Sequence, residues 1–408
     1  MRRVAVTGLG VVSALGVGVD AFWRRLVAGT SGVRRITRFD PSGFLAQAAA
    51  EVPDFDPGTW FDESTIDALD RFSQYAIVAA DEAWRQSGAA LDERDRDRAG
   101  AIVASGMGGV GAQDEAYYRM YAKGNTRLHP FTIARIMNNA AAGHVSMRFG
   151  LRGPTLSTAT ACAAAAHAIG EAAEMVRSGR ADLMLAGGAD APLVPGVVRA
   201  WEALRVLAPS ADDPARTCRP FSRDRQGMVL GEGAGVVVLE AWDRAEARGA
   251  TILAELVGYG ATADAAHLTH PGLEAPARAI SIALDEARLP PDAIDYVNAH
   301  GTATRLNDSA ETAILVRAFG AHAPRLAISA TKAMHGHAMG ASAALEFIAT
   351  VLALTHGVVP PTINYTQPDP DCHLDYVPND ARDLRIRAAI SNSFAFGGLN
   401  AVLAVRRA

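Results

Sequence analysis

Two stretches of sequence with the same plan decide the fold. The first is Leu156-Ser157-Thr158-Ala159-Thr160, which leads into an alanine-rich run from Cys162 to Arg177. The second is Ile328-Ser329-Ala330-Thr331-Lys332, which leads into another alanine-rich run from Ala338 to Leu354. Each stretch predicts a strand, then a turn of small residues, then a helix. The first turns of both predicted helices hold almost nothing larger than alanine, so the two helices can approach closely in the middle of a layered structure. We therefore expect an α/β protein built from two similar halves.

Short β-branched runs alternate with alanine-rich helical stretches along the rest of the chain, which is the pattern of helices covering a largely buried sheet. Strands are predicted at Val4–Thr7, Ala101–Ala104, Leu183–Ala186, Gly235–Glu240, Leu253–Tyr259, Tyr296–Asn298, Leu326–Ser329, Ala389–Ser393 and Ala401–Val405. The glycine pair Gly397-Gly398 between the last two predicts a hairpin. We place the boundary between the halves near Ala250, which gives residues 1–249 and 250–408, with insertions around residues 30–75 and 105–150 in the first half.

The composition indicates a globular protein with a sizeable core. Of the 408 residues, 49% are hydrophobic and 20% are charged, which excludes a disordered chain. The formal net charge of −5 leaves no basic surplus for a phosphate backbone, so nucleic acid is not expected as a partner. Cys162, Cys218 and Cys372 lie far apart without a C-x-x-C pair, which argues against a disulfide framework and fits a reducing, cytoplasmic location.

The first residues superficially resemble a secretory signal, because Met1-Arg2-Arg3 precedes an apolar run from Val4 to Val19. Four glycines interrupt that run, and Val4-Ala5-Val6 is more typical of a buried strand that opens the fold. No stretch of 18 or more apolar residues is uninterrupted, so no membrane-spanning segment is predicted.

Cys162 stands at the start of a predicted helix, after a turn rich in serine and threonine. The partial positive charge and free N–H groups of a helix N-terminus favour a thiolate, and they lower a cysteine pKa from about 8.5 to between about 3.5 and 7.5. Such a position is typical of a nucleophile. From the spacing alone, a small buried hydrophobe fits equally well, since free cysteine is among the most buried residue types.

His300 ends a predicted strand and begins the loop Gly301-Thr302-Ala303-Thr304, before a helix capped by Asn307 or Asp308. The carboxyl end of a strand in an α/β sheet is where such proteins bind ligands, so His300 is a candidate site residue. A turn histidine exposed to water is the alternative that local evidence leaves open.

Several other motifs recur in metal or phosphate sites, and we reject them here. His335 and His337 have a spacing that can bind a metal, but no third ligand is visible nearby, so no zinc site is expected. Gly8-Leu9-Gly10 lacks the third glycine of a dinucleotide fingerprint. Gly106–Gly109 and Gly231–Gly235 lack the Lys-Ser/Thr pair of a P-loop, and tight turns account for them.

Taken together, these segments resemble the elongating β-ketoacyl-acyl carrier protein synthases, the thiolase-fold condensing enzymes of fatty-acid and polyketide synthesis. The motifs that carry the resemblance run in order over nearly the whole chain: Val4 to Gly10, Thr160-Ala161-Cys162, Phe221 to Gly235, His300 to Thr304 with Asn307-Asp308, Lys332 to His337, and Asn392 to Gly398. The resemblance implies a thiolase-like, five-layered α-β-α-β-α fold of two similar halves.

The resemblance also implies roles for individual residues. Cys162 matches the acyl-accepting nucleophile, and His300 and His337 match the pair that promotes decarboxylation of the malonyl extender. Lys332 matches a motif lysine that organises the site, with Glu346 as its charge partner. The backbone N–H groups of Cys162 and Phe396 match an oxyanion hole, and Phe396 also matches a gating residue. Thr302 and Thr304 match residues that contact the phosphopantetheine arm. Met107 matches a wall of the acyl pocket.

The family's reaction explains why these residue types are needed. Cys162 takes the acyl chain from a carrier thioester, and the covalent intermediate divides a difficult reaction into two steps. Loss of carbon dioxide from malonyl carrier protein leaves an enolate, to which neutral His300 and His337 can each offer an N–H. The carbanion then attacks the Cys162 thioester and extends the chain by two carbons. No metal or organic cofactor is implied, because the substrates travel on the phosphopantetheine of an acyl carrier protein.

One cysteine with two histidines is typical of the elongating branch, since chain-initiating relatives carry asparagine in place of the second histidine. Ala303, His335, Ala395 and Leu399 depart from residues frequent in fatty-acid enzymes, and we interpret all four as pocket positions. They favour a specialised type II polyketide or polyene synthase, with housekeeping fatty-acid elongation as the alternative.

Two other classes of protein are alternatives. A papain-like cysteine hydrolase has Cys162, His300 and Asn392 in the same chain order, but the local signature of that family is absent. The second alternative is a partner subunit that binds acyl chains without condensing them, and the presence of Cys162 and both histidines argues against it. The resemblance implies an acyl carrier protein as partner and a dimer, formed either by two copies or with a chain-length factor.

Overall fold

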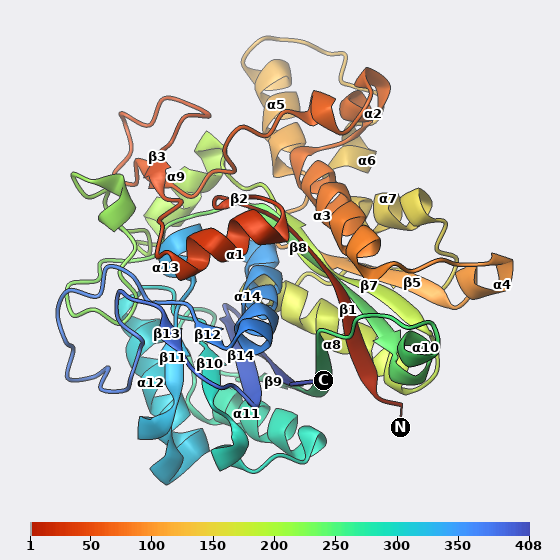
Figure 1. The fold of residues 1–408 in the computed structure, drawn as a ribbon. Coiled ribbons are helices and arrows are strands. Elements are labelled where there is room, and N and C mark those ends of the chain that lie inside the picture. Colours follow the sequence, from red (N-terminus) through yellow and green to blue (C-terminus); the bar gives the residue numbers. More distant parts are fainter. Residues whose placement is uncertain (1) are drawn as a thin grey trace.

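The computed structural model describes residues 2–408, and its main feature is one mixed sheet with helices on both sides (Figure 1). The strands run in the order β11-β10-β14-β15-β9-β1-β8-β7-β5-β6, with the short β2 beside β1. Their bounds are Val4–Ser13 (β1), Gly16–Val17 (β2), Ala99–Ala104 (β5), Thr155–Leu156 (β6), Leu183–Asp190 (β7), Gly233–Ala241 (β8), Ala254–Ala263 (β9), Tyr296–Asn298 (β10), Ala327–Ser329 (β11), Ala388–Ala395 (β14) and Leu399–Arg406 (β15). Each of the nine predicted strands overlaps one of these.

The strand directions repeat about the middle of the sheet. β1 pairs antiparallel with β8 and β8 with β7, whereas β7, β5 and β6 are parallel. β9, β15, β14, β10 and β11 follow the same sequence of directions. β1 meets β9 at the centre, and β14 and β15 form the predicted hairpin. The predicted fold class of two similar α/β halves is confirmed.

Helices form three layers around and between the two groups of strands (Figure 1). α8 (Ala164–Arg177) and α14 (Ser342–His356) lie in the middle and contact strands of both halves. α3 (Arg71–Ser87) and α7 (Ala140–Phe149) cover the first half on the outside, and α11 (Glu274–Ala287) and α12 (Arg305–Phe319) cover the second. The order of layers is therefore α-β-α-β-α.

The remaining elements are short or peripheral. The helices are α1 (Val19–Val27), α2 (Glu63–Ala68), α4 (Glu93–Arg96), α5 (Val110–Tyr121), α6 (Thr132–Ile136), α9 (Pro195–Ala203), α10 (Trp242–Ala247) and α13 (Lys332–His335). Two small sheets pair β3 (Arg34–Arg35) with β4 (Ala48–Ala49) and β12 (Val358–Val359) with β13 (Arg382–Asp383). The predicted boundary near Ala250 lies between α10 and β9, and the division into domains 1–249 and 250–408 stays a prediction.

Small residues let the two central helices approach each other and the strands, as the sequence predicted. A Cβ atom added to Gly188 in β7 would come within 2.9 Å of the Ala165 Cβ and 2.7 Å of the Gly340 carbonyl oxygen. The tight turn predicted for Gly231–Gly235 is wrong in part, because β8 begins at Gly233. Gly235 is required there because an added Cβ would lie 2.9 Å from the Ala344 Cβ of α14.

The Gly-x-Gly pattern of β1 is a packing feature, and it occurs once in each half. An added Cβ at Gly8 would lie 2.1 Å from the Ala83 carbonyl oxygen of α3. Gly258 in β9 meets the Ala283 carbonyl oxygen of α11 in the same way, at 2.0 Å. Both outer helices therefore sit almost on the strand backbone, where no side chain fits.

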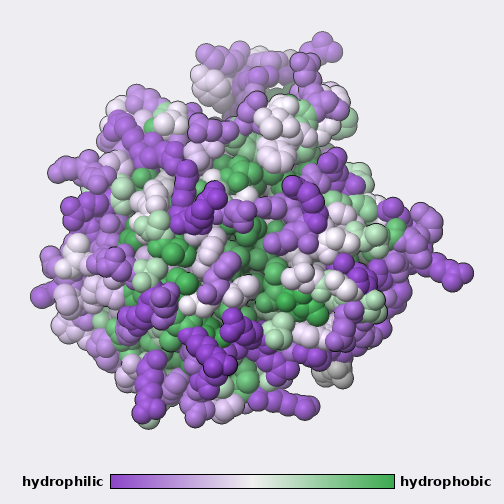
Figure 2. Space-filling model, viewed as in Figure 1, coloured by the Kyte–Doolittle hydropathy of each residue, from purple (hydrophilic) through white to green (hydrophobic). Residues whose placement is uncertain are grey.

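The apolar N-terminal segment and the apolar helix of the second half both belong to the interior. β1 is buried over its whole length, so the apolar N-terminal run is a central strand. Within residues 2–408, Met339–His356 is apolar and long enough to cross a membrane, but 89% of it is buried in the fold. On the face shown in Figure 2, hydrophilic residues cover most of the rim, and hydrophobic residues are visible mainly toward the centre.

Candidate active site

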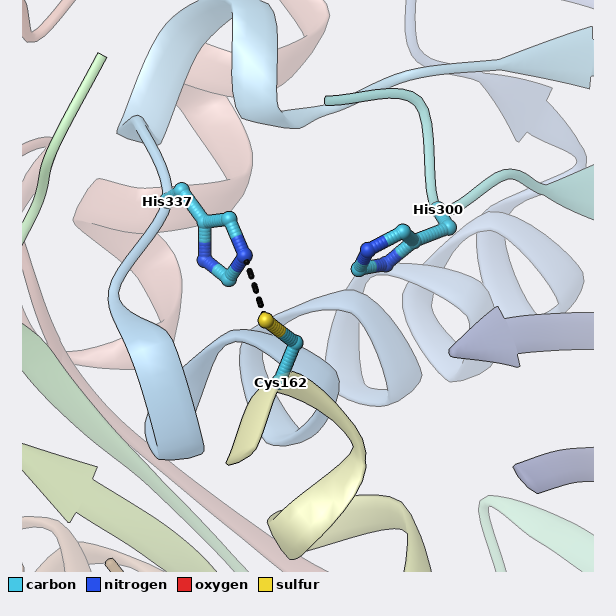
Figure 3. A group of neighbouring side chains, drawn as sticks. All are labelled: Cys162, His300 and His337. Carbon is cyan, nitrogen blue, oxygen red and sulfur yellow. Dashed lines mark hydrogen bonds between the residues drawn. The ribbon is translucent and has the colours of Figure 1, made fainter. Parts of the chain in front are cut away.

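The candidate site lies where loops from both halves meet beside the central helices. Cys162 belongs to a short 3₁₀ turn, Ala161–Ala163, directly before α8. His300 follows β10, and His337 lies between α13 and the 3₁₀ turn Met339–Ala341. All three side chains are buried, and one donor atom from each lies within 4.8 Å of the others. Figure 3 shows both imidazole rings directed toward the cysteine sulfur.

His337 holds its proton on the nitrogen that faces the sulfur. Its Nε2 lies 3.0 Å from Sγ of Cys162. The backbone N–H of Met339 donates to Nδ1 at 3.1 Å, and the Ser342 hydroxyl lies 2.9 Å from the same atom. Because a backbone N–H can only donate, Nδ1 is the acceptor, and a neutral ring carries its hydrogen on Nε2.

His300 is held in the same tautomer by a different group. The Lys332 ammonium lies 3.3 Å from His300 Nδ1 and donates to the His300 carbonyl oxygen at 2.7 Å. An ammonium has no acceptor, so Nδ1 accepts and Nε2 carries the hydrogen. Burial and the Lys332 charge lower the pKa of His300 and of His337 well below the usual histidine value, so both rings are neutral N–H donors.

The loop that carries His300 is fixed by Glu311, a residue that the sequence analysis missed. The backbone N–H groups of His300 and Gly301 each donate to a Glu311 carboxylate oxygen at 2.8 Å. Burial raises the pKa of Glu311 to about 7, and these hydrogen bonds oppose the shift. Glu311 lies nearly two helical turns into α12, and no local motif distinguishes it from an exposed acidic residue of an amphipathic helix.

Lys332 and Glu346 form a fully buried ion pair. Burial raises the pKa of Glu346 to about 7, and the Lys332 ammonium opposes that rise. A buried pair of this kind costs desolvation energy and persists where its geometry serves another purpose. Here the ammonium also contacts His300, so the pair sets the charge and orientation of the site.

The cysteine departs from the expectation that a helix N-terminus would lower its pKa. Burial raises the pKa of the Cys162 thiol to about 11, and desolvation outweighs the Lys332 charge and the backbone N–H groups of Phe396 and Cys162. Those two N–H groups nevertheless lie close enough to act on the sulfur, and their role as an oxyanion hole for a thioester carbonyl formed there stays a prediction. The resting site therefore contains a thiol beside neutral imidazoles.

A cavity of about 660 Å³ connects the sulfur to the surface. Thr302 and Thr304 line it, with their hydroxyls 2.9 Å apart. Thr304 also caps α12, accepting from the Asn307 backbone N–H at 3.3 Å. The predicted cap at Asn307 or Asp308 is therefore wrong by one turn, because the helix begins at Arg305.

Phe396 lies in the β14–β15 turn at the cavity, and this turn is held by residues that the sequence analysis missed. Its ring packs against Trp201 with centroids 5.8 Å apart. The next residue, Gly397, donates its N–H to the Leu268 carbonyl oxygen at 2.7 Å, and Asp264 N–H donates to the Gly398 carbonyl oxygen at 2.9 Å. Trp201 lies in α9, and Asp264 and Leu268 follow β9, so these contacts come from remote parts of the chain without a motif and only the fold reveals them.

Some predicted pocket positions lie elsewhere. Ala395 is among the described residues that line the cavity, whereas Ala303, His335 and Leu399 are not, so the interpretation of these three as pocket positions stays a prediction. His335 is instead buried against Thr331, 3.0 Å from its hydroxyl. Met107 lies outside this lining and packs in an apolar cluster with Leu193 and Val198. Its role as a wall of the acyl pocket stays a prediction.

The sulfur and the two imidazoles also match the ligand types that zinc prefers. The Lys332 charge, 3.3 Å from His300 Nδ1, opposes a second cation in the same buried space. His335 points away from His337, so the metal-like spacing of that pair has no counterpart in the site. Metal-free chemistry stays our expectation.

Comparisons with known proteins cover the whole chain. A model described as "Beta-ketoacyl synthase, N-terminal domain" matches residues 1–245, and "Beta-ketoacyl synthase, C-terminal domain" matches residues 253–366. Nodulation protein E of Rhizobium sp. (strain N33) is 48% identical over 406 residues, covering 100% of this chain and 99% of that protein. The 3-oxoacyl-[acyl-carrier-protein] synthase 2 of Coxiella burnetii is 43% identical over 408 residues, with 100% and 99% covered. The solved structure of the ishigamide ketosynthase/chain length factor has a TM-score of 0.91 and 40% identity, covering 100% of this chain and 99% of that one.

Alkylation tests the protonation state of the nucleophile. We expect the rate at which iodoacetamide modifies Cys162 to rise about tenfold per pH unit between pH 7 and 9, because a raised thiol pKa leaves the thiolate a small fraction there. Mass spectrometry of the peptide containing Cys162 measures the rate, and Cys162→Ser serves as the blank. A rate that is already maximal at pH 7 would show a thiolate in the resting enzyme.

Proposed function

The chain belongs to the beta-ketoacyl synthase family, and we propose that it catalyses the decarboxylative Claisen condensation of a Cys162-bound acyl chain with malonyl-acyl carrier protein. One observation carries this assignment of residues. Two neutral imidazoles, those of His300 and His337, direct Nε2–H groups toward one cysteine sulfur at a cavity that opens to the surface. The activity is that of a β-ketoacyl-acyl carrier protein synthase, an acyltransferase.

The first step is acyl transfer to Cys162. Its sulfur attacks the thioester carbonyl of the acyl carrier, the carbon–sulfur bond to the carrier breaks, and the carrier leaves as a free thiol with the cysteine proton. The carbonyl oxygen gains charge during the attack, and the backbone N–H groups of Cys162 and Phe396 are placed to stabilise it. The His337 Nε2–H, 3.0 Å from Sγ, stabilises the sulfur as it loses its proton.

The second step is loss of carbon dioxide from the malonyl carrier. The carbon–carbon bond to the carboxylate breaks, and its electron pair forms an enolate of the carrier thioester. His300 and His337 each offer an Nε2–H to the enolate oxygen, and neutral donors suit this role because they need no proton exchange. Lys332 keeps both rings neutral and holds His300 through Nδ1.

The third step forms the new carbon–carbon bond. The enolate carbon attacks the Cys162 thioester, and the oxygen of the tetrahedral intermediate occupies the site formed by the Cys162 and Phe396 N–H groups. The carbon–sulfur bond to Cys162 then breaks, which releases a β-ketoacyl carrier and a thiolate that takes up a proton. The cycle consumes no redox equivalent, and the residues present supply every donor that it uses.

The alternatives from other classes are not favoured. Asn392 donates to Glu311 at 3.3 Å, so it does not orient a catalytic histidine as a papain-like site would require. A binding-only subunit is not favoured either, because the cysteine and both imidazoles converge in one cavity. A cytoplasmic reaction is part of the proposal, and the three free, buried cysteines fit it.

The pathway stays a prediction of type II polyketide or polyene synthesis. The likeness to a structure named as the ishigamide ketosynthase/chain length factor supports it, whereas the relative from Coxiella supports fatty-acid elongation to a similar degree. The chain length and the starter unit depend on the depth of the cavity and on the partner, so product analysis decides them.

A surface suited to a partner subunit lies at the β6 end of the sheet. β6 is exposed, whereas β11 at the other end is buried, so β6 presents a free strand edge. Large apolar side chains are exposed on this strand and on the segment that includes α5, α6 and α7: Tyr117, Tyr118, Tyr121, Leu128, Phe131, Ile133, Met137, Met147 and Leu156. We expect the second subunit, another copy or a chain-length factor, to cover them.

Acyl transfer to the protein tests the nucleophile. Incubation with an acyl carrier protein should add the acyl mass to the peptide that contains Cys162, and Cys162→Ala should abolish the addition. Tandem mass spectrometry locates the modification, with Cys218→Ala as a matched control because that buried cysteine lies outside the cavity lining. Labelling at any other residue would refute the assignment.

Histidine variants test the division of roles. We expect His300→Ala and His337→Ala to retain most self-acylation while malonyl-carrier decarboxylation falls by about 10² to 10³, the usual cost of one lost donor. Carbon dioxide release from labelled malonyl carrier and acyl-enzyme mass measure the two steps separately. Equal loss of both steps would contradict the proposed roles.

A charge at the β6 edge tests the partner surface. We expect Leu156→Glu to shift the protein from dimer to monomer in analytical ultracentrifugation, because the acid would be buried against a second subunit. Leu306→Glu on α12 is the matched control, since Leu306 is 56% exposed but lies on another face. A wild-type protein that is monomeric alone and dimeric only with a co-expressed chain-length factor would identify the heterodimer.

A further inference from the structure

Asp190, at the end of β7, is a buried carboxylate that the proposed reaction does not use. Its side chain is fully buried and forms no ion pair within residues 2–408. Four donors surround it: the Ser105 hydroxyl at 2.6 Å, and the backbone N–H groups of Gly106 at 2.9 Å, Met107 at 3.1 Å and Gly340 at 2.6 Å. Three of these donors lie on the loop after β5, and the fourth lies in the turn that follows His337.

The turn that Asp190 contacts is strained. Met339 has a φ of 47°, a left-handed conformation that a side chain other than glycine adopts at a cost of about 1 kcal/mol or more. This conformation directs the Met339 N–H to Nδ1 of His337 at 3.1 Å. The next peptide, at Gly340, donates to Asp190 Oδ2. The carboxylate therefore holds the residue that follows the strained one.

Close packing leaves no room for a side chain at Gly340. A Cβ added there would lie 2.4 Å from the Gly106 nitrogen and 2.7 Å from Asp190 Oδ2. The turn and the loop after β5 are thus in direct contact, and the carboxylate hydrogen-bonds to both. Removing it leaves the Ser105 hydroxyl and three backbone N–H groups without this acceptor, and the strained turn loses a contact that holds it.

We propose that Asp190 is a positioning residue, which holds the Met339–Gly340 turn so that the Met339 N–H keeps His337 in the tautomer with Nε2–H toward the substrate. The hydrogen-bond partners of His337 Nδ1 are the uncharged Ser342 hydroxyl and Met339 N–H, whereas Nδ1 of His300 lies against the Lys332 ammonium, which can only donate. The Met339–Gly340 turn therefore determines which nitrogen of His337 is the donor. The effect on turnover rests on the proposed function, whereas the effect on the tautomer does not.

The experiment compares Asp190→Ala with Asp70→Ala. Asp70 is a matched control, because it is a buried carboxylate that accepts backbone N–H groups of Phe72 at 3.1 Å and Ala112 at 2.7 Å, outside the cavity lining. Both variants should lower the thermal unfolding midpoint. We expect only Asp190→Ala to change the ¹⁵N shifts of the His337 ring from the Nε2–H tautomer toward a mixture, in protein labelled with [¹⁵N]histidine. A His337→Gln variant identifies the resonances.

The same variants are assayed for carbon dioxide release from malonyl carrier. We expect Asp190→Ala to lose about 10²-fold or more with a small change in KM, and Asp70→Ala to stay within about threefold of the wild type. Asp190→Asn should retain the wild-type tautomer, because its amide oxygen, in place of Oδ2, can still accept from Gly106 and Gly340. The amide N–H₂ then faces the Ser105 hydroxyl, which can rotate to accept, and the Met107 N–H, which loses its acceptor. Should Asp190→Ala not fold, Asp190→Ser carries the test, because its hydroxyl is one bond too short to hold both loops.

The outcomes are distinguishable. An unchanged His337 spectrum in folded Asp190→Ala or Asp190→Ser overturns the proposal, and so does an equal loss of decarboxylation in Asp70→Ala. Absence of decarboxylation in the wild type contradicts the proposed function, while the ¹⁵N spectra still decide the role of Asp190.

Discussion

The structure depends on the close approach of α8 and α14 between the two groups of strands. Cys162 immediately precedes α8, and His337 precedes the turn that leads into α14, so the distance between these helices sets the distance between sulfur and imidazole. Small residues at Gly188, Ala165 and Gly340 allow that approach, since an added Cβ at Gly188 would overlap both neighbours. A methyl group in this region would therefore affect chemistry through geometry, although it touches no substrate.

Burial has two opposite effects in the space that this approach creates. It keeps the imidazoles of His300 and His337 neutral, which suits hydrogen-bond donation to an enolate, and it raises the pKa of the Cys162 thiol, which hinders nucleophilic attack. The Lys332 charge acts on both groups in the useful direction. It lowers the pKa of the histidines further and opposes the rise at cysteine, so one ammonium serves both steps. Its own burial is balanced by Glu346.

The sequence predicted the strands and the central helices because each of these has a local signal, whereas the resemblance to a known family pointed to the residues that meet around the sulfur. Hydrophobic runs marked the strands, and small residues marked the helices that approach each other. The pKa of Cys162 was not predictable in this way, since a helix N-terminus is visible in sequence and the degree of desolvation is not. Trp201 and Asp264 were missed for a similar reason, as their contacts with the Phe396 turn come from elements far away along the chain.

In each half, a buried carboxylate accepts two consecutive backbone N–H groups after equivalent strands, with a different consequence in each half. After β10, Glu311 accepts two consecutive backbone N–H groups, at His300 and Gly301, and so holds the loop that carries the His300 imidazole. After β5, the equivalent strand of the first half, Asp190 accepts the consecutive N–H groups of Gly106 and Met107. Burial raises the pKa of both carboxyls, to about 7 and about 6, so each depends on its hydrogen bonds to remain charged. The first-half loop carries no imidazole, and its carboxylate reaches across to the His337 turn instead. A repeated scaffold has thus placed the nucleophile in one half and both donors in the other, with a buried carboxylate from each half fixing one donor.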